Sequence, residues 1–359
     1  MWGDIAIAFV LSFITAFMIT PYTIKLARKV GALDVPKESR RIHEKPMPRL
    51  GGIAVVSGFF VAAIYLISIM TIEKNIILFG EDGTITSLLG FLAGAIILIT
   101  FCLIDDIKQI PAIVKLFGQI LASTCIVFTG TRIVDVNIPF IATSQLNSIV
   151  SIIITYGWII GITNAINLID GLDGLATGIS AISAISLLII FSLNGSPIIA
   201  IILIAALTGA LIGFLPYNFN PAKTFIGDTG SNFLGFSLAI ISILGIAKTY
   251  TAIVIVAPLI VLALPIFDTL FAIVRRVIKG KSLKAIIMAD KGHLHHRIMK
   301  KGYTQRQAVI LLYCISAISG MFAVVLLESG IWKALSFALI VIAVCAIGFK
   351  QVINLNEED

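Results

Sequence analysis

Five aspartates occur in short polar motifs between long apolar runs. Asp105 and Asp106 are adjacent, Asp170 and Asp173 lie in NAINLIDGLDGLATG, and Asp228 lies in FIGDTGSN. Carboxylates near a lipid bilayer are costly unless they are solvated, paired or bound to metal. A hard cation such as Mg²⁺ binds carboxylate oxygens and commonly accompanies a phosphate substrate. The aspartates therefore predict a site for a cation and a phosphate, with one carboxylate available as a base.

The stretch NAINLIDGLDGLATG carries more polar groups than a connecting turn needs. Asn167, Asp170 and Asp173 are three residues apart, a spacing that places them on one face of a helix. Gly171 and Gly174 indicate a tight backbone whose amide groups can approach a ligand. An ordinary turn is the alternative, since D-G pairs favour turns. We expect the stretch to line a substrate site at the membrane edge.

The other aspartates also have two interpretations. Asp105 and Asp106 could begin a solvated loop, and Asp228, Thr229 and Ser231 could cap the helix that follows them. The functional alternative is that Asp228 binds a cation while N–H groups at that helix start face a phosphate. Both interpretations of this motif are compatible.

Histidines and basic residues could supply the opposite charge. The stretch KGHLHHRIMKK holds His293, His295, His296 and Arg297. Histidine and arginine donate hydrogen bonds to phosphate oxygens, so we expect a clamp on a pyrophosphate. Zinc is an alternative, although no Cys and no H-E-x-x-H pattern accompany the histidines; a solvated basic loop is another. Asp268, near the inner end of a predicted span, is a buried charge whose role is open.

These motifs are separated by apolar segments of about 17–23 residues, each long enough to cross ~30 Å of hydrocarbon. Of the 359 residues, 58% are hydrophobic and 13% are charged, against about 25% charged in soluble domains. The sequence therefore predicts an all-α polytopic membrane protein with one catalytic domain over residues 1–359. Its eleven transmembrane helices are expected at 2–24, 50–70, 87–104, 112–130, 146–163, 177–193, 197–215, 231–247, 250–271, 307–327 and 331–349.

The distribution of positive charge predicts an orientation. With the amino terminus outside, the inside loops hold 22 of the 26 Lys and Arg residues, a strong positive-inside bias. The net charge of +7 therefore reflects membrane topology, and no nucleic acid is expected as a partner. The carboxyl terminus is then cytoplasmic. All the polar motifs fall on the cytoplasmic side, in loops at about 25–49, 105–115, 164–176, 216–230 and 272–306.

Taken together, the motifs resemble the polyprenyl-phosphate N-acetylhexosamine-1-phosphate transferase family. PRLGG, the Asp pair, NAINLIDGLDGLATG, FIGDTGSNFLGF and HLHH follow the family's order over most of the chain. The resemblance implies transfer of GlcNAc 1-phosphate from UDP-GlcNAc to undecaprenyl phosphate, with Mg²⁺ (Mn²⁺ being the alternative ion) and release of UMP. It implies a bacterial cytoplasmic membrane protein, a homodimer, that begins synthesis of cell-envelope polysaccharides such as teichoic acid or O-antigen.

The resemblance also assigns roles to residues. Asp228 would bind the metal, and Asp105 would be the catalytic carboxylate with Asp106 as its partner. Direct attack by the lipid phosphate, with Asp105 as base, is favoured over a covalent enzyme intermediate. Further residues are assigned to substrate: Asn167, Asp170, Asp173, Phe225 (near the uracil), His293, His295, His296, Arg297, Lys115 and Lys45.

Three other functions compete with this one. Phospho-MurNAc-pentapeptide transferases show P-T-M-G-G and three consecutive histidines, and PRLGG and HLHHR differ from both. This favours a GlcNAc donor, although GalNAc or a dideoxy-HexNAc would fit the same phosphate chemistry. A secondary transporter would carry its carboxylates near the midplane within inverted repeats, and no repeat is evident. A CDP-alcohol phosphotransferase would need D-G-x-x-A-R, and DGLATG lacks the Arg.

Overall fold

The computed structural model describes residues 1–35, 46–72, 84–136, 144–246, 252–280 and 292–355, and this part of the chain is mainly helical. Two short antiparallel hairpins, β1–β2 and β3–β4, interrupt the helices. The elements in chain order are α1 (Trp2–Val30), β1 (Leu33–Asp34), β2 (Met47–Pro48), α2 (Gly51–Ile72), α4 (Thr84–Lys108), α5 (Ala112–Phe128), β3 (Asp135–Val136), β4 (Ser144–Gln145), α6 (Ser148–Ile169), α7 (Leu175–Leu193), α8 (Ile198–Asn218), α9 (Gly227–Ile246), α10 (Ala252–Val261), α11 (Ala263–Gly280), α12 (Leu294–Lys300), α13 (Gln305–Ser329) and α14 (Ile331–Leu355).

The helices confirm a polytopic helical membrane protein. Within the described residues, seven helices are long and apolar enough to cross a bilayer, and Ala112–Phe128 and Ile331–Ala343 are shorter apolar helices. The predicted span at 250–271 differs, because Leu262 separates α10 from α11 there. Pro265 explains the break, since proline lacks the N–H that would bond to the carbonyl of Val261 and clashes with it. The count of eleven spans and their orientation stay predictions.

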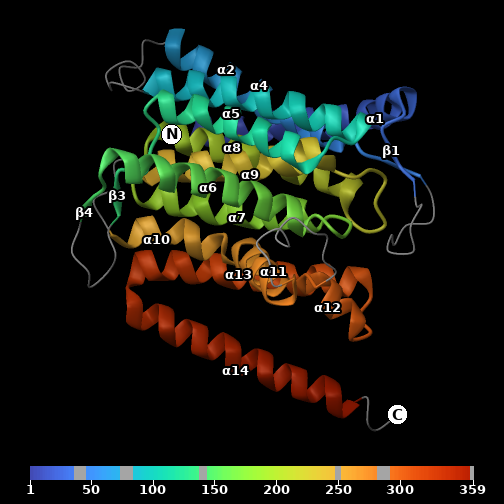
Figure 1. The fold of residues 1–359 in the computed structure, drawn as a ribbon. Helices are drawn as coiled ribbons and strands as arrows, with labels where there is room; N and C mark the ends of the chain where they lie inside the picture. Colours follow the sequence, from blue (N-terminus) through green and yellow to red (C-terminus); the bar gives the residue numbers. More distant parts are fainter. Residues whose placement is uncertain (36–45, 73–83, 137–143, 247–251, 281–291, 356–359) are drawn as a thin grey trace.

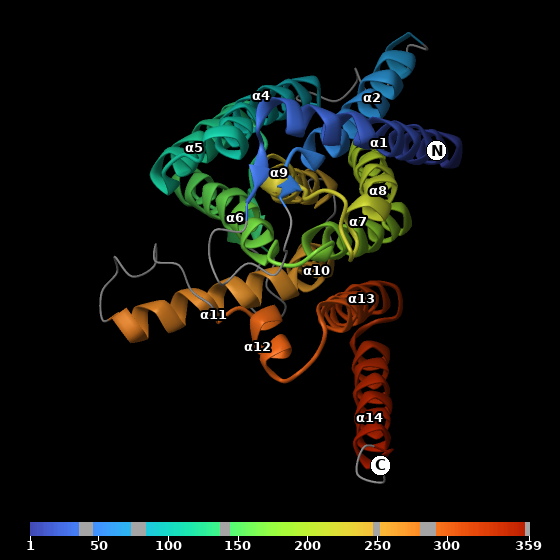
Figure 2. The same ribbon diagram turned by 90° about the vertical axis from the view of Figure 1, so that its right-hand side faces the viewer.

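Helix α9 occupies the centre of the bundle (Figure 2). It packs against α6, α4, α2, α7 and α8, while α1 lies along α8 and α2 at the periphery. Glycines permit the closest crossings: a Cβ on Gly209 would lie 2.2 Å from the carbonyl oxygen of Phe9, and one on Gly235 would lie 2.5 Å from Cα of Thr163. Small residues at helix crossings let the backbones approach closely. This increases van der Waals packing, which is important in a membrane because the hydrophobic effect does not drive helices together there.

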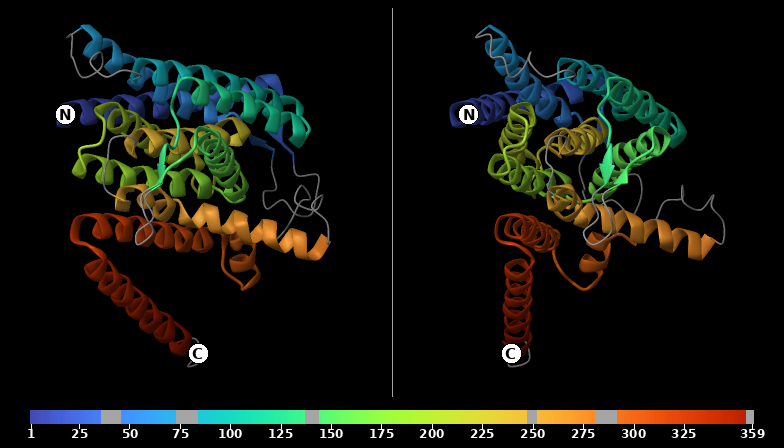
Figure 3. Two further views of the ribbon diagram at one scale, coloured as in Figure 1. Left: turned by 60° about the vertical axis from the view of Figure 1, so that its left-hand side comes forward. Right: turned by 90° about the vertical axis from the view of Figure 1, so that its left-hand side faces the viewer.

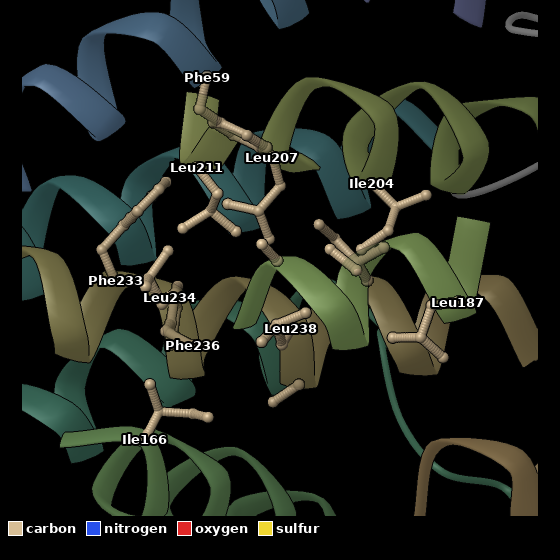
Figure 4. Close-up of a cluster of buried hydrophobic side chains, with 14 of the residues drawn as sticks. Phe59, Ile166, Leu187, Ile204, Leu207, Leu211, Phe233, Leu234, Phe236 and Leu238 are labelled. Atoms are coloured by element: carbon tan, nitrogen blue, oxygen red, sulfur yellow. The ribbon is translucent and has the colours of Figure 1, made fainter. Parts of the chain in front are cut away.

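Large apolar side chains fill the space around α9 (Figure 4). Phe59 on α2 and Phe233 on α9 are fully buried and meet edge to face, with ring centroids 5.4 Å apart. Phe236 on α9 stacks against Phe91 on α4 with centroids 6.1 Å apart. Such aromatic pairs add about 0.5–1.5 kcal/mol each beyond the area that they bury. The packed core therefore fixes where the first turn of α9 lies.

The two ends of the bundle differ. The β1–β2 hairpin and α12 lie at one end and the β3–β4 hairpin at the other (Figure 1). Helices α10, α11 and α13 cover one side, and α14 contacts α13 and then diverges from the bundle (Figure 3). The polar motifs of the sequence gather at the end that carries β1, β2 and α12.

Candidate active site

Four helix ends bring their polar residues to Asp228. This aspartate lies in the first turn of α9, and three side chains donate hydrogen bonds to its carboxylate. Arg49 Nη2 lies 2.9 Å from Oδ2, Asn167 Nδ2 lies 2.9 Å from Oδ1, and Lys115 Nζ lies 3.3 Å from Oδ1. Asn167 also donates to Ser231 Oγ at 2.8 Å. Residues from α5, α6, α9 and the segment before α2 thus converge on one carboxylate.

The PRLGG segment carries Arg49 into this site by pairing with the strand-like backbone before α9. Phe225 N–H donates to the carbonyl of Pro48 at 2.8 Å, and Gly52 N–H donates to the carbonyl of Ile226 at 2.8 Å. A Cβ on Gly52 would lie 2.3 Å from the backbone nitrogen of Gly230, so the pairing requires glycine. No role was assigned to Arg49 from the sequence, although it lies in PRLGG, and the neighbouring G-G pair was the available signal.

Asp106 caps helix α9 from outside that helix. Its Oδ1 accepts the N–H of Asp228 at 2.8 Å, and its Oδ2 accepts the N–H of Thr229 at 2.9 Å and the hydroxyl of Thr229 at 2.6 Å. The first N–H groups of a helix need acceptors, and this carboxylate, whose side chain is fully buried, supplies them. The expectation that these N–H groups face a phosphate is therefore wrong for Asp228 and Thr229.

Asp105 is differently placed from its neighbour. Its Oδ1 accepts the N–H of Ile110 at 2.7 Å, and its Oδ2 accepts a hydrogen bond from Lys115 Nζ at 2.8 Å. Lys115 therefore bridges Asp105 and Asp228. The two adjacent aspartates therefore have different roles: Asp106 binds the start of α9, and Asp105 shares the amine of Lys115 with Asp228.

Asn167, Asp170 and Asp173 do not share a helix face. Helix α6 ends at Ile169, Asp170 follows it, and Asp173 lies in a turn before Gly174, whose φ is +76°. Asp173 Oδ2 accepts the side-chain amide of Asn220 and the N–H of Ala222, each at 3.0 Å. The predicted helical spacing of these residues is wrong, because α6 ends at Ile169, before Asp170 and Asp173, and α7 begins only after Gly174. Asp173 instead fixes the loop between α8 and α9.

Asp170 lacks the hydrogen-bond donors that surround Asp228. Its side chain accepts no hydrogen bond from the residues that the structure describes, whereas Asp228 accepts three. Burial, together with the negative charge of Asp228, raises the pKa of Asp170 to about 8. A nearby positive charge would favour the ionised form of Asp170.

The His stretch approaches the same loop. His293 and His295 are buried, and a Cβ on Gly171 would lie 2.4 Å from His295 Nε2. Burial and the neighbouring His296 lower the pKa of His295 to about 3. His295 is consequently neutral at physiological pH, and it can offer an N–H or a lone pair but not the positive charge expected of a cationic clamp. Arg297 is exposed.

Of the remaining predicted substrate residues, the structure describes Phe225 but not Lys45. Phe225 is half-buried in the segment that leads to Asp228, as expected for a residue near the site. Lys45 lies outside the described residues. Sequence reasoning missed Gln119, whose amide donates to Asn232 Oδ1 at 2.9 Å and accepts from Asn164 Nδ2 at 2.8 Å. This buried network on α5, α6 and α9 is continued by Asn232, which donates to the carbonyl of Asp228.

The donor set suits Mg²⁺ better than a transition metal. No three His, Cys, Asp or Glu side chains among the described residues are grouped as a ready-made cage. Mg²⁺ is commonly held by one or two carboxylates together with water and substrate phosphates. Asp228 offers such a carboxylate, and its negative charge raises the pKa of Asp170, so a cation bound here would favour ionisation of both carboxyl groups. The residues therefore fit a Mg²⁺ that Asp228 would hold with the substrate.

The chain is a membrane transferase that belongs to glycosyl transferase family 4. The sequence model of that family matches residues 88–246. These residues run from α4 to the end of α9 and include both adjacent aspartates, NAINLIDGLDGLATG and FIGDTGSN. The alternative of a secondary transporter is thereby excluded.

Individual relatives make the likeness more specific. The chain is 40% identical to the probable undecaprenyl-phosphate N-acetylglucosaminyl 1-phosphate transferase of Bacillus subtilis, over 94% of this chain and 89% of that protein. It is 30% identical to the decaprenyl-phosphate N-acetylglucosaminephosphotransferase of Mycolicibacterium smegmatis, over 86% of this chain and 79% of that protein. The phospho-N-acetylmuramoyl-pentapeptide-transferase of Halalkalibacterium halodurans is 26% identical, over 88% of this chain and 95% of that protein.

Proposed function

We propose that this chain transfers N-acetylglucosamine 1-phosphate from UDP-GlcNAc to undecaprenyl phosphate, forming undecaprenyl-diphosphate-GlcNAc and UMP. The observation that carries the proposal is the convergence of Arg49, Lys115 and Asn167 on Asp228 at one end of a membrane bundle. Both substrates are phosphorylated, so cations and amide donors around one carboxylate match what they need. The greater identity to the GlcNAc enzymes than to the MurNAc-pentapeptide enzyme supports the choice of sugar.

The reaction is one displacement at phosphorus. An oxygen of the lipid phosphate attacks the phosphorus that carries the sugar, and the bond from that phosphorus to the oxygen of UMP breaks. Asp105 is the base that accepts any proton left on the lipid phosphate, since burial and the nearby charge of Asp228 raise its pKa above the usual range of a carboxyl group. When bound, Mg²⁺ neutralises charge on the phosphate oxygens.

Arg49 and Lys115 supply positive charge to the phosphates. Arg49 is only 18% exposed and its fork-shaped guanidinium can bind a phosphate through two parallel hydrogen bonds. Lys115 contacts Asp105 at 2.8 Å and Asp228 at 3.3 Å, so its positive charge lies between the two carboxylates and is available to the phosphate as the bond to UMP breaks. Asn167 holds the Asp228 carboxylate in place through Oδ1. Asp106 keeps the first turn of α9, and with it Asp228, in register with α4.

The protein acts in a bacterial cytoplasmic membrane, with the site on the cytoplasmic face where nucleotide sugars are available. The charge bias of the loops supports this orientation. The product is suited to begin a cell-envelope polysaccharide such as teichoic acid or O-antigen. Dimerisation, which the family resemblance implies, is part of the same proposal.

The deciding experiment uses purified protein in detergent with undecaprenyl phosphate and a panel of UDP-HexNAc donors. We expect UMP release with UDP-GlcNAc in the presence of Mg²⁺, and none with UDP-MurNAc-pentapeptide. Formation of the lipid-linked sugar is confirmed by mass spectrometry. Turnover with the pentapeptide donor, or with no donor of the panel, would overturn the proposal.

A further inference from the structure

The charge that the sequence left without a role, Asp268, is bound to the start of the His stretch. Its Oδ2 lies 2.8 Å from Nδ1 of His293, and its Oδ1 accepts the N–H of Leu294 at 2.8 Å. The Asp268 and His293 side chains are each only 6% exposed. A carboxylate only accepts hydrogen bonds, so the pairing places a ring proton on Nδ1 of His293. Both oxygens of one side chain on α11 thus fix the residues that open α12.

The ring of His295 depends on that fixed start. The His293 and His295 rings lie nearly parallel, with centroids 5.8 Å apart and an interplanar angle of 8°. His295 is 2% exposed, and neither of its ring nitrogens has a hydrogen-bond partner in the described structure. A buried polar group without a partner costs about 1–3 kcal/mol. The ring is therefore held in an unfavourable position by its surroundings.

The position of the His295 ring points to the donor site. The ring abuts Gly171, which lies directly after Asp170 in the loop between α6 and α7. No side chain longer than glycine fits at Gly171 beside it, because an added Cβ would come within 2.4 Å of Nε2. A substrate that reaches the loop beside Asp170 is thus the available partner for the free nitrogens of His295.

We propose that Asp268 is a positioning residue: by holding His293 and Leu294 it sets the rotation of α12 and keeps His295 against Gly171, where the ring meets the sugar-nucleotide donor. The inference deepens the proposed function and rests on it for its kinetic test. Asp268 does not contact the substrate. Its effect on substrate binding requires His295. A hydrogen bond that only stabilised the fold would have the same effect with or without that imidazole.

The kinetic test compares Asp268→Ala with a matched variant of another interhelical bond. Trp158→Phe removes hydrogen bonds from the indole Nε1 on α6 to the carbonyl of Ala239 and the hydroxyl of Ser242 on α9. Trp158 precedes Asn167 by nine residues, about 13 Å along the helix. We expect Asp268→Ala to raise KM for UDP-GlcNAc about tenfold and Trp158→Phe to leave it within about twofold.

A double variant isolates the dependence on His295. In a His295→Gln background, Asp268→Ala should change KM by less than about twofold, because no imidazole remains to be positioned. Full additivity of the two substitutions would overturn the proposal, as would an unchanged KM in Asp268→Ala alone.

A labelling experiment is independent of the enzymatic function. Diethyl pyrocarbonate modifies neutral imidazole, and peptide mass spectrometry locates the modified histidine. The buried ring of His295 should react slowly in the unmodified protein and at least about threefold faster in Asp268→Ala. His293→Ala removes the hydrogen bond between the two side chains from the other side and serves if Asp268→Ala does not fold. Equal His295 labelling in both variants and the unmodified protein would refute the positioning role, even if no UDP-sugar were turned over.

Discussion

Asp106→Asn tests whether this aspartate is a helix cap or a catalytic group. The carboxylate accepts two backbone N–H groups and one hydroxyl, all at the start of α9. An amide keeps one oxygen, so either orientation turns an NH₂ group toward the N–H of Asp228 or of Thr229. One buried donor then loses its acceptor, and the negative charge at the helix start is lost as well.

The magnitude follows from these two losses. A buried N–H without an acceptor costs about 1–3 kcal/mol, and a negative charge at a helix start contributes about 0.3–1 kcal/mol. We therefore expect the free energy of unfolding to fall by about 1.5–4 kcal/mol. At roughly 2 °C per kcal/mol, the midpoint of thermal unfolding in detergent should fall by about 3–8 °C.

Asp105→Asn is the matched control, since it changes the neighbouring residue in the same chemical way. Its amide oxygen can still accept the N–H of Ile110, and Lys115 keeps Asp228 as a partner. We expect its unfolding midpoint to stay close to that of the unmodified protein, while kcat for UMP release falls by about 10²–10⁴-fold. An unchanged midpoint in Asp106→Asn, or an equal loss of stability in both variants, would refute the division of roles.

Three further predictions concern the metal, pH and the loop before α9. Asp228→Asn should abolish Mg²⁺-dependent UMP release, and EDTA should do so reversibly in the unmodified protein; full activity in EDTA contradicts a metal role. The folded-state pKa of His295, about 3, lies below its unfolded value near 6.5, so the unfolded chain binds the extra proton and stability falls as pH falls below 6.5. From pH 7 to pH 5 the free energy of unfolding should fall by about 2 kcal/mol more than it does in His295→Gln. An equal fall in the thermal unfolding midpoint of both proteins between these pH values would contradict this. Asp173→Ala removes the acceptor for Asn220 and Ala222, so proteolysis between α8 and α9 should accelerate; cleavage at the original rate argues against the anchoring role.

The cations of the site are paired with its carboxylates. Arg49 and Lys115 both contact Asp228, so a phosphate or a metal ion that enters must compete for these contacts. Such pairing avoids leaving buried charges uncompensated, which is costly in a low-dielectric site. It also means that binding of the donor and binding of a cation are coupled, because each releases a partner for the other.

Local sequence properties sufficed for much of the fold. Mean hydropathy over about 20 residues decides whether a helix can cross a bilayer, and ten of the predicted spans each coincide with one helix. The remaining predicted span, 250–271, is divided at Leu262. Pro265 indicated this break in the sequence, but mean hydropathy does not reflect a single proline. The carboxylates Asp105, Asp170 and Asp228 were also identifiable, because charge is rare in so apolar a chain.

The roles of those residues were decided by contacts between distant parts of the chain. Asp106 binds the start of α9, 122 residues away, and Arg49 reaches Asp228 over 179 residues. Asp173 turns toward the loop before α9, since α6 ends at Ile169 and no helix continues to align Asp173 with Asn167. Residue type and hydropathy determine which side chains can do chemistry and which segments enter the membrane. Which acceptor a given donor meets depends on how the helices pack around α9, and only the tertiary structure decides that.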